Sequence, residues 1–203
     1  MDPTFIEEHG AIVPDSAYFP SVQFRGDRWD FTHLRPFAMT RVLGSGVKVD
    51  VVVFFSCHCF THKLRDDDRD GADIPEGEFW VDDEGDERVL DEIRYKLSAA
   101  LPEIIRNFDK GHVRVMTPWQ DPRTRRVHKE SFFKVAVPKP DGTTDDYVLF
   151  FSLDKDRERK RRFILRVKSA YPMAAWTRKM NDAKKVNFLI LLNAKNEGRE
   201  IRR

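Results

Sequence analysis

The sequence predicts an α+β fold in which a mostly antiparallel sheet packs on one main helix, with a strand-rich N-terminal section. Two observations carry this prediction. Short polar links separate the apolar segments of the second half, which favours hairpins and therefore antiparallel pairing. One long segment, residues 86–109, instead repeats its apolar residues with a period near 3.6, as an amphipathic helix does.

Three segments of the N-terminal half have the composition of strands: residues 18–25, 36–43 and 47–60. The third is the strongest, because most of its residues up to Phe55 are β-branched or aromatic. Its later part is apolar on both faces, so we expect a central strand that is covered on both sides. Within the helical segment, Pro102 interrupts the pattern, and we expect either a kink or a junction of two helices there.

The C-terminal half reads as a meander of strands that a short helix and a last strand follow. The turn at 138–142 separates two of the strands, because its proline, aspartate and glycine residues favour a reversal of the chain. No glycine-rich phosphate loop occurs, and strands do not alternate with helices, which argues against a doubly wound nucleotide-binding fold. The expected elements are strands at 112–117, 131–137, 147–153 and 161–171, a helix at 173–185 and a strand at 186–192.

An acidic stretch divides the chain of 203 residues, since twelve of the 22 residues from Asp66 to Glu87 are Asp or Glu. A loop of this length is functional or mobile when it occurs in a compact domain. We therefore expect a strand-rich section at 1–64, an acidic loop at 65–85, and a helix with an antiparallel sheet and a basic end at 86–203. Together they are expected to form one compact unit.

The net charge of +2 conceals a strong segregation of charge. Residues 155–203 carry 16 Lys and Arg against 5 Asp and Glu, a balance of +11, and the rest of the chain balances at −9. Such asymmetry favours a polyanionic partner such as RNA, although a solvated basic face gives the same composition.

The composition also limits the location of the protein. No segment approaches about 18 consecutive apolar residues, so we expect no membrane span and no membrane partner. The acidic N-terminus lacks the apolar core of a secretory signal. Two cysteines are too few for a disulfide framework, which predicts a cytoplasmic location with reduced thiols.

Strand parity predicts what the open face of the sheet presents. In the strand at 161–171, a period of two places Arg162, Arg166 and Lys168 on one face. In the strand at 131–137, the corresponding face takes Phe132 and Lys134. Cations around an aromatic ring are typical of surfaces that bind phosphates and stack bases, but an ordinary polar face of an antiparallel sheet alternates in the same way. The opposite face of the strand at 161–171 takes Phe163, Leu165, Val167, Ser169 and Tyr171.

The meander that follows the main helix, with its segments Tyr147–Phe151 and Arg162–Pro172, resembles the barnase–EndoU–colicin–RelE group of small ribonuclease toxins. The resemblance covers roughly residues 86–193 and is greatest to the prophage-associated members. It implies cleavage of RNA without a metal or another cofactor, by basic, histidine, tyrosine or hydroxyl side chains on the open face of the sheet.

Cleavage of RNA by its 2′-hydroxyl needs a base, a cation that stabilises the crowded phosphorane, and an acid. Histidine suits either proton role, because its ordinary pKa is about 6.5, and His128 precedes a strand of the sheet, although a plain loop histidine would look the same. Lysine and arginine on the open face would stabilise charge, and the hydroxyls would position the phosphate or belong to the core. The candidate catalytic residues are His128, Lys134, Arg166, Lys168, Ser169 and Tyr171, and the candidate RNA-binding residues are Arg125, Arg126, Arg162 and Phe132.

A run of cysteine and histidine at residues 56–62 is the most unusual local feature. Cys57, Cys59 and His62 could supply three ligands of a zinc ion. The single residue between the cysteines argues against this, because paired zinc ligands are mostly separated by two or more residues, and small thiols pack readily in a core. His58 and His62 are also candidates for proton transfer, which would place an active site at the junction of the two halves.

The sequence therefore favours a ribonuclease or RNA-binding, toxin-like protein that acts through a basic open sheet face. Two alternatives stay open. The first is a non-catalytic protein-interaction module, such as an accessory protein of a mobile element that docks through its acidic loop. The second is a zinc-dependent enzyme centred on the cysteines. An inhibitory protein partner is a further expectation, and the acidic loop could itself inhibit by lying over the basic sheet.

Overall fold

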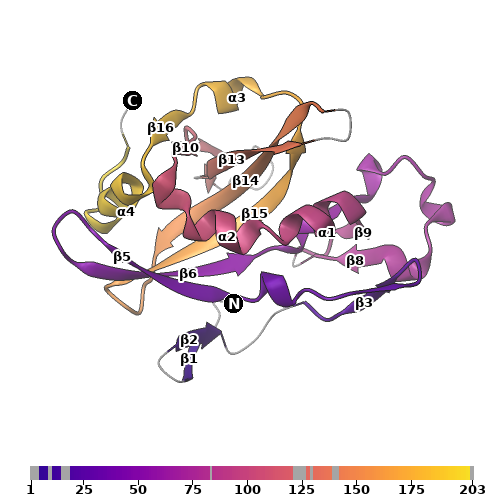
Figure 1. Cartoon of the computed structure of the whole chain (residues 1–203), viewed down its shortest axis with the longest axis horizontal. Coiled ribbons are helices and arrows are strands. Elements are labelled where there is room, and N and C mark those ends of the chain that lie inside the picture. The colour runs from indigo at the N-terminus through magenta and orange to yellow at the C-terminus, as the bar shows by residue number, and fades with distance from the viewer. Residues whose placement is uncertain are drawn as a thin grey trace.

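The structure is a computed structural model, and it shows the predicted α+β fold, with both halves of the chain contributing to the central sheet (Figure 1). For the strand residues 5–8, 11–14, 119–120 and 127–128 it describes the backbone alone. The described residues are 5–8, 11–14, 19–82, 84–120, 127–128, 130–138 and 142–201.

A mixed sheet of seven strands forms the centre of the fold. Its neighbouring strands are antiparallel, as predicted, except that β15 and β6 are parallel. The N-terminal strands β5 and β6 thus extend the C-terminal meander rather than forming a layer of their own. In spatial order the strands are β16 (Lys184–Val186), β10 (Val113–Val115), β13 (Ser131–Pro138), β14 (Thr144–Lys155), β15 (Arg162–Met173), β6 (Lys48–Phe55) and β5 (Phe37–Val42).

Smaller sheets flank this centre. The acidic stretch folds with its neighbours into a three-stranded sheet of β7 (Thr61–Lys63), β9 (Glu87–Leu90) and β8 (Phe79–Val81), and residues 61–90 are called the acidic lobe below. Three hairpins complete the strands: β1 (Phe5–Glu8) with β2 (Ala11–Pro14), β3 (Val22–Phe24) with β4 (Asp27–Trp29), and β11 (Trp119–Gln120) with β12 (Val127–His128).

The helices are short. The α-helices are α1 (Glu92–Ser98), α2 (Leu101–Arg106), α3 (Arg178–Asn181) and α4 (Phe188–Asn196). The 3-10 turns are η1 (Thr32–Leu34), η2 (Cys57–Cys59), η3 (Leu64–Asp66), η4 (Gly71–Asp73), η5 (Glu76–Glu78) and η6 (Phe108–Lys110). No helix in the described ranges is long and apolar enough to cross a membrane.

The helical segment predicted at 86–109 contains two short helices that meet near Pro102, one of the two expected alternatives, but its first residues are not helical. Its first residues form strand β9, and α1 begins only after Asp91, whose side chain accepts a hydrogen bond from the Arg94 backbone N–H. Pro102 lies in the first turn of α2, where the absence of an N–H costs nothing, so the helix breaks before it rather than kinking. The apolar period is real, but it spans two helices and a strand.

The C-terminal elements also differ from the prediction. Strand β15 continues to Met173, and α3 begins only after Thr177, whose hydroxyl accepts from the Met180 backbone N–H. The strand predicted at 186–192 is instead helix α4, in which Phe188, Leu191 and Leu192 are buried at helical spacing. A short run of apolar residues fits a buried strand or a buried helix equally well, and here the cap residue Asn187 decides for the helix.

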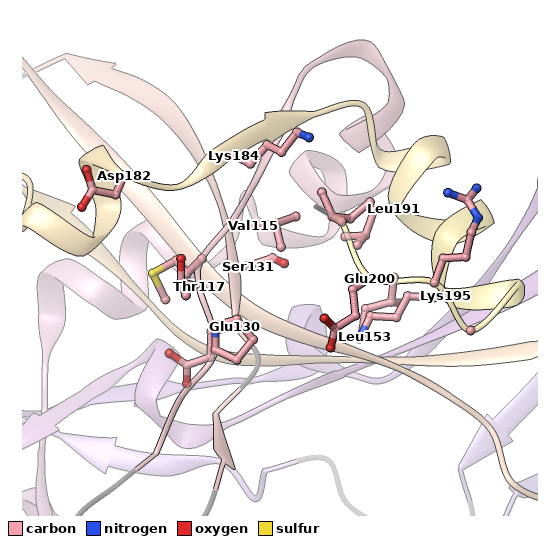
Figure 2. A pocket seen from close by; sticks show the side chains of 15 residues that line it. Val115, Thr117, Glu130, Ser131, Leu153, Asp182, Lys184, Leu191, Lys195 and Glu200 are labelled. Atoms are coloured by element: carbon pink, nitrogen blue, oxygen red, sulfur yellow. The ribbon is translucent and has the colours of Figure 1, made fainter. Parts of the chain in front are cut away.

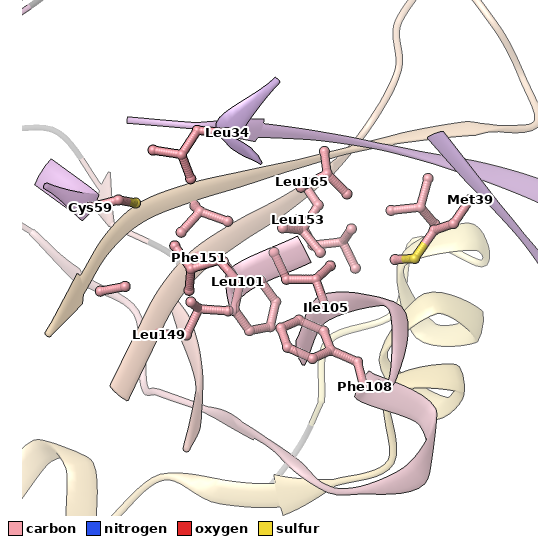
Figure 3. Close-up of a cluster of buried hydrophobic side chains, with 14 of the residues drawn as sticks. Leu34, Met39, Cys59, Leu101, Ile105, Phe108, Leu149, Phe151, Leu153 and Leu165 are labelled. Carbon is pink, nitrogen blue, oxygen red and sulfur yellow. The ribbon is translucent and has the colours of Figure 1, made fainter. Parts of the chain in front are cut away.

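Helices α2 and α4 cover one face of the sheet (Figure 1). Leu101 and Ile105 of α2 lie against Phe151 and Leu153 of β14 and Leu165 of β15 (Figure 3). Alternate residues of β14 point to this core, and its intervening residue Val148 points to a second, smaller cluster on the opposite face. The two clusters fix the orientation of every side chain on the central strands.

Truncation of Phe108, in η6, is expected to destabilise the core. Its ring is fully buried against the rings of Phe133, Phe151 and Phe188. We predict that Phe108→Ala lowers the free energy of unfolding by about 3–5 kcal/mol, because truncation removes buried area and leaves a cavity. Urea denaturation measures this. The control is Ile93→Ala, which truncates a side chain that is 64% exposed and should change stability by about 0.5 kcal/mol or less. Equal effects of the two substitutions would contradict the core described here.

Candidate functional site

The face of the sheet opposite α2 and α4 gathers five of the ten predicted site residues. A β-bulge in β15 adds two of them, Ser169 and Tyr171, to this face. Phe150 of β14 pairs with Ser169, but the next residue, Phe151, pairs with Val167, so Lys168 is an extra residue. The extra residue reverses the parity of everything that follows it. Ser169 and Tyr171, which simple alternation assigned to the core face, therefore join Arg166 and Lys168. The open face, as named below, comprises Arg114, Lys134, Asp146, Phe150, Arg166, Lys168, Ser169, Tyr171 and Trp176.

A row of aromatic rings crosses the open face from strand to strand. Tyr171 stacks on Phe150 with 5.7 Å between ring centroids, and Phe150 lies 5.8 Å from Phe132. Trp176, in the segment after β15, meets Phe132 edge to face at 5.4 Å. Phe132 is fully buried, whereas Phe150, Tyr171 and Trp176 are partly exposed. The row therefore offers three accessible rings above a buried one.

Cations flank both ends of this aromatic row. The Arg114 guanidinium lies 4.7 Å and the Lys134 ammonium 4.8 Å from the centroid of Trp176. At the other end, the Arg94 guanidinium of α1 lies 4.7 Å from the centroid of Tyr171. A cation over a ring face is attracted by the negative face of the ring, so these contacts hold the rings in place.

Two carboxylates reduce the positive charge of the open face. Asp146 accepts hydrogen bonds from the Lys134 ammonium at 2.9 Å and from the Trp176 indole N–H at 2.7 Å. The hydrogen bond from Lys134 is the main cause of the lowered pKa of Asp146, which stays ionised. Glu130 pairs with Lys168 at 3.3 Å. The face is thus a mixed surface of rings, cations and two acids rather than the uniformly basic one that parity predicted.

Arg94 connects the open face to the acidic lobe. Besides covering Tyr171, its guanidinium donates to the backbone carbonyls of His58 and Thr61 and pairs with Asp91 at 3.2 Å. Burial raises the pKa of Tyr171, against the opposing effect of Arg94, so its hydroxyl keeps its proton at neutral pH. A polar network around Arg94 therefore occupies the junction of the two halves.

Both histidines of the 56–62 run lie in this network. His62 is held between two carboxylates, with Nδ1 3.2 Å from Asp91 and Nε2 2.9 Å from Asp67. The hydrogen bond with Asp91 is the main cause of its raised pKa, and Asp67 adds to it against the effect of burial. His58 lies 3.0 Å from Asp82, but burial outweighs this contact and lowers its pKa. The pKa values of the two histidines are thus shifted in opposite directions, upward for His62 and downward for His58.

The acidic lobe uses its buried carboxylates internally. Glu78 forms ion pairs with Arg25 and Arg69, and Asp67 forms a second ion pair with Arg69. These ion pairs hold the lobe against β3, and they lie outside the open face. The expectation that the acidic stretch inhibits by lying over the sheet gains no support from them.

The two cysteines do not lie on a strand. They occupy the 3-10 turn η2, where Cys59 is fully buried and Cys57 is 6% exposed. Burial raises the pKa of the Cys59 thiol far above its usual range, so it is an unreactive core residue. Among the side chains that the structure describes, no group of His, Cys, Asp and Glu could hold a metal ion, and Cys57, Cys59 and His62 do not form one.

Two predicted RNA-binding residues need correction. Phe132 is fully buried beneath Trp176, so its ring cannot stack on a base. Arg162 is 3% exposed and is paired with Asp156, at the end of β15 far along the strand from Tyr171. Alternation with a period of two predicts the side of the sheet to which a residue points, but not whether other residues cover that side. Arg125 and Arg126 lie outside the described residues, and of His128 only the backbone in β12 is described.

Sequence analysis missed the residues that organise the open face. Trp176 lies in a segment expected to be helical, and Arg114 lies on the strand at 112–117, whose alternation could have placed it. Asp146 precedes the expected start of its strand by one residue. Arg94 and Phe150 lacked any pattern that would have singled them out.

A comparison with known families assigns this molecule to one of them. Residues 21–195 match the YjaZ family. The chain belongs to the YjaZ family. The matched range includes the acidic lobe, the seven-stranded sheet and the open face, so the site described here lies within the part that defines membership of the YjaZ family. No curated protein and no solved structure matches the chain.

The contacts of His62 with the carboxylates of Asp67 and Asp91 predict that stability depends on pH. Because the pKa of His62 is raised in the folded protein, folding favours its protonated form. That stabilisation is complete below the ordinary pKa of about 6.5 and is lost as the pH rises through the raised value. We predict that the free energy of unfolding, measured by urea denaturation, is higher for wild type than for His62→Gln. This difference should be largest at pH 6 and smallest at pH 9.

The control for this prediction is His112→Gln, which removes an exposed imidazole from outside the network. This variant measures how a His→Gln substitution outside the network changes stability. A difference between wild type and His62→Gln that stays constant from pH 6 to pH 9 would show that the imidazole is not charged in the folded protein.

Proposed function

We propose that this chain binds single-stranded RNA through the open face of its sheet. The aromatic row supports this most directly: three partly exposed rings, Phe150, Tyr171 and Trp176, cross the face with cations at both ends. Proteins that bind single strands combine aromatic platforms, on which bases stack, with cations that follow the phosphates. Duplex RNA keeps its bases stacked on each other and would not use the rings.

The distribution of charge supports a polyanion. Residues 155–203, which supply most of the open face and the segments beside it, carry a balance of +11. Arg166 and Lys168 lie beside Ser169 and Tyr171, and Arg114 lies at the far end of the row. A strand that runs across the sheet would therefore meet cations along its whole path.

The proposal is limited to binding, although the sequence also favoured cleavage. Lys134 and Lys168, two of the predicted catalytic cations, are each paired with a carboxylate. Of the proposed base His128, the structure describes the backbone alone. Cleavage is checked in the same experiment, because a gel of the bound RNA reveals fragments.

The test measures binding of a 15-nucleotide oligouridylate, labelled with fluorescein, by anisotropy at several salt concentrations. We predict that Arg166→Ala/Lys168→Ala weakens binding roughly tenfold at 100 mM salt and flattens the salt dependence, because phosphate contacts release counterions. The matched control is Arg157→Ala/Lys160→Ala, which removes the same charge from exposed positions of the β14–β15 connection. Binding should change little in this control.

Several results would contradict the proposal. They are absent binding by the wild type, binding that is insensitive to salt, and equal weakening in both double variants. Retention of a protein from a lysate without RNA binding would instead favour the protein-interaction alternative.

A second prediction concerns whether removal of an acidic charge from the open face strengthens RNA binding. Asp146 is the acid that neutralises Lys134 beside Trp176. Asp146→Asn keeps an acceptor for the indole N–H but removes a negative charge, so RNA should bind about threefold more tightly. Asp73→Asn makes the same change in charge at an exposed position of the acidic lobe and should have a smaller effect. Weaker binding by Asp146→Asn, with an unchanged melting temperature, would show that RNA does not approach this part of the face.

A further inference from the structure

A pocket of about 540 Å³ lies between the sheet and α4 (Figure 2). Strands β10, β13 and β14 contribute its inner wall, and α4 with the last described residues contributes the outer wall. Small-molecule sites commonly have volumes of roughly 300–1,000 Å³, an apolar lining and a few polar groups that fix the ligand. The volume of this pocket lies in that range, and its lining combines an aliphatic surface with charged groups.

The pocket contains an aliphatic surface with a hydroxyl beside it. Val115, Leu153 and Leu191 form this surface, and the Ser131 hydroxyl points into the space between them (Figure 2). Ser131 is 7% exposed. A hydroxyl both donates and accepts hydrogen bonds, so Ser131 can bind a polar atom of a ligand in the pocket.

The outer wall depends on how α4 ends. The backbone N–H of Arg199 donates to the carbonyl of Ala194, and that of Gly198 donates to Lys195, in a Schellman motif. Gly198 adopts a φ of +68°, which a glycine tolerates best. The motif turns the chain back, so that Glu200 and Ile201 lie along the pocket opposite β13. The wall is therefore an ordered part of the helix end.

Charges of both signs surround the aliphatic surface in equal number. The basic residues are Lys184, Lys195 and Arg199, and the acidic residues are Glu130, Asp182 and Glu200. Glu130 is paired with Lys168 and Arg199 with Glu197, both outside the pocket, so one charge of each sign is compensated. Lys195 and Glu200 lie at the same end of the pocket, and neither has an ion-pair partner in the described part of the chain (Figure 2).

We propose that this pocket binds a small zwitterion with an apolar body, of the class of the apolar α-amino acids. The ligand carboxylate meets the Lys195 ammonium, its ammonium meets the Glu200 carboxylate, and its side chain lies on Val115, Leu153 and Leu191. A simple anion would leave Glu200 facing its negative charge, and a simple cation would leave Lys195 facing its positive charge. Charge balance around an apolar surface therefore selects the ligand that carries both charges. The inference is independent of RNA binding.

The first experiment varies the ligand and leaves the protein unchanged. Binding of phenylalanine, N-acetylphenylalanine and phenylalaninamide to the full chain is measured at pH 6 by NMR titration. Acetylation removes the ammonium charge and amidation removes the carboxylate charge. We expect phenylalanine to bind and each derivative to bind about tenfold more weakly, since a hydrogen bond to a charged group is worth roughly 1.5–3 kcal/mol. Absence of phenylalanine binding, or equal binding of the three compounds, would overturn the proposal.

The second experiment assigns each ligand charge to a residue. Lys195→Met retains the side-chain stem but removes its charge, so phenylalanine and phenylalaninamide should bind this variant equally, while acetylation still weakens binding. Glu200→Gln should give the reverse pattern. Lys160→Met, at an exposed position outside the pocket, is the matched control and should behave as wild type. If both pocket variants kept the wild-type preference among the three ligands, the site would lie elsewhere. RNA binding is measured separately, so either proposal can fail alone.

Discussion

The parallel pairing of β15 with β6 is the interaction on which the rest of the fold depends. It joins a strand of the N-terminal section to the C-terminal meander over six paired positions, from Arg162 with Asp50 to Val167 with Phe55. It also brings η2, which follows β6, against β15, where α1 packs as well. Arg94 can cover Tyr171 only because of this pairing. Without it, the chain would consist of a hairpin and a separate meander.

The bulge at Lys168 determines which side chains of β15 lie on the open face. On the first half of β15, Phe163, Leu165 and Val167 face the core beneath α2, and after the bulge Ala170 takes the core side. Ser169 and Tyr171 consequently lie on the same side as Arg166. One inserted residue thus moves two hydroxyl side chains from the interior to the surface that carries the cations.

The sequence was sufficient for the fold class and for most of the strands, because alternation and turn residues are local properties. It was insufficient where a tertiary contact decides. A bulge has no composition of its own, so the face of Tyr171 could not be predicted, and the burial of Phe132 depends on Trp176, which lies more than forty residues away in the chain. The apolar run before Asn193 fits a strand or a helix until the Asn187 cap is considered. Ion pairs such as Lys134 with Asp146 join neighbouring strands, and parity alone does not predict them.

The parallel pairing also has a consequence for how the chain acquires its structure. Strand β6 is synthesised about a hundred residues before β15, its parallel neighbour. During that interval the β5–β6 hairpin has an unpaired, strongly apolar edge, and such edges tend to pair with other chains. Contacts this distant in sequence slow folding, because a long loop must close first. Chaperone binding to the nascent N-terminal hairpin would therefore protect this protein more than one whose strands pair in order of synthesis.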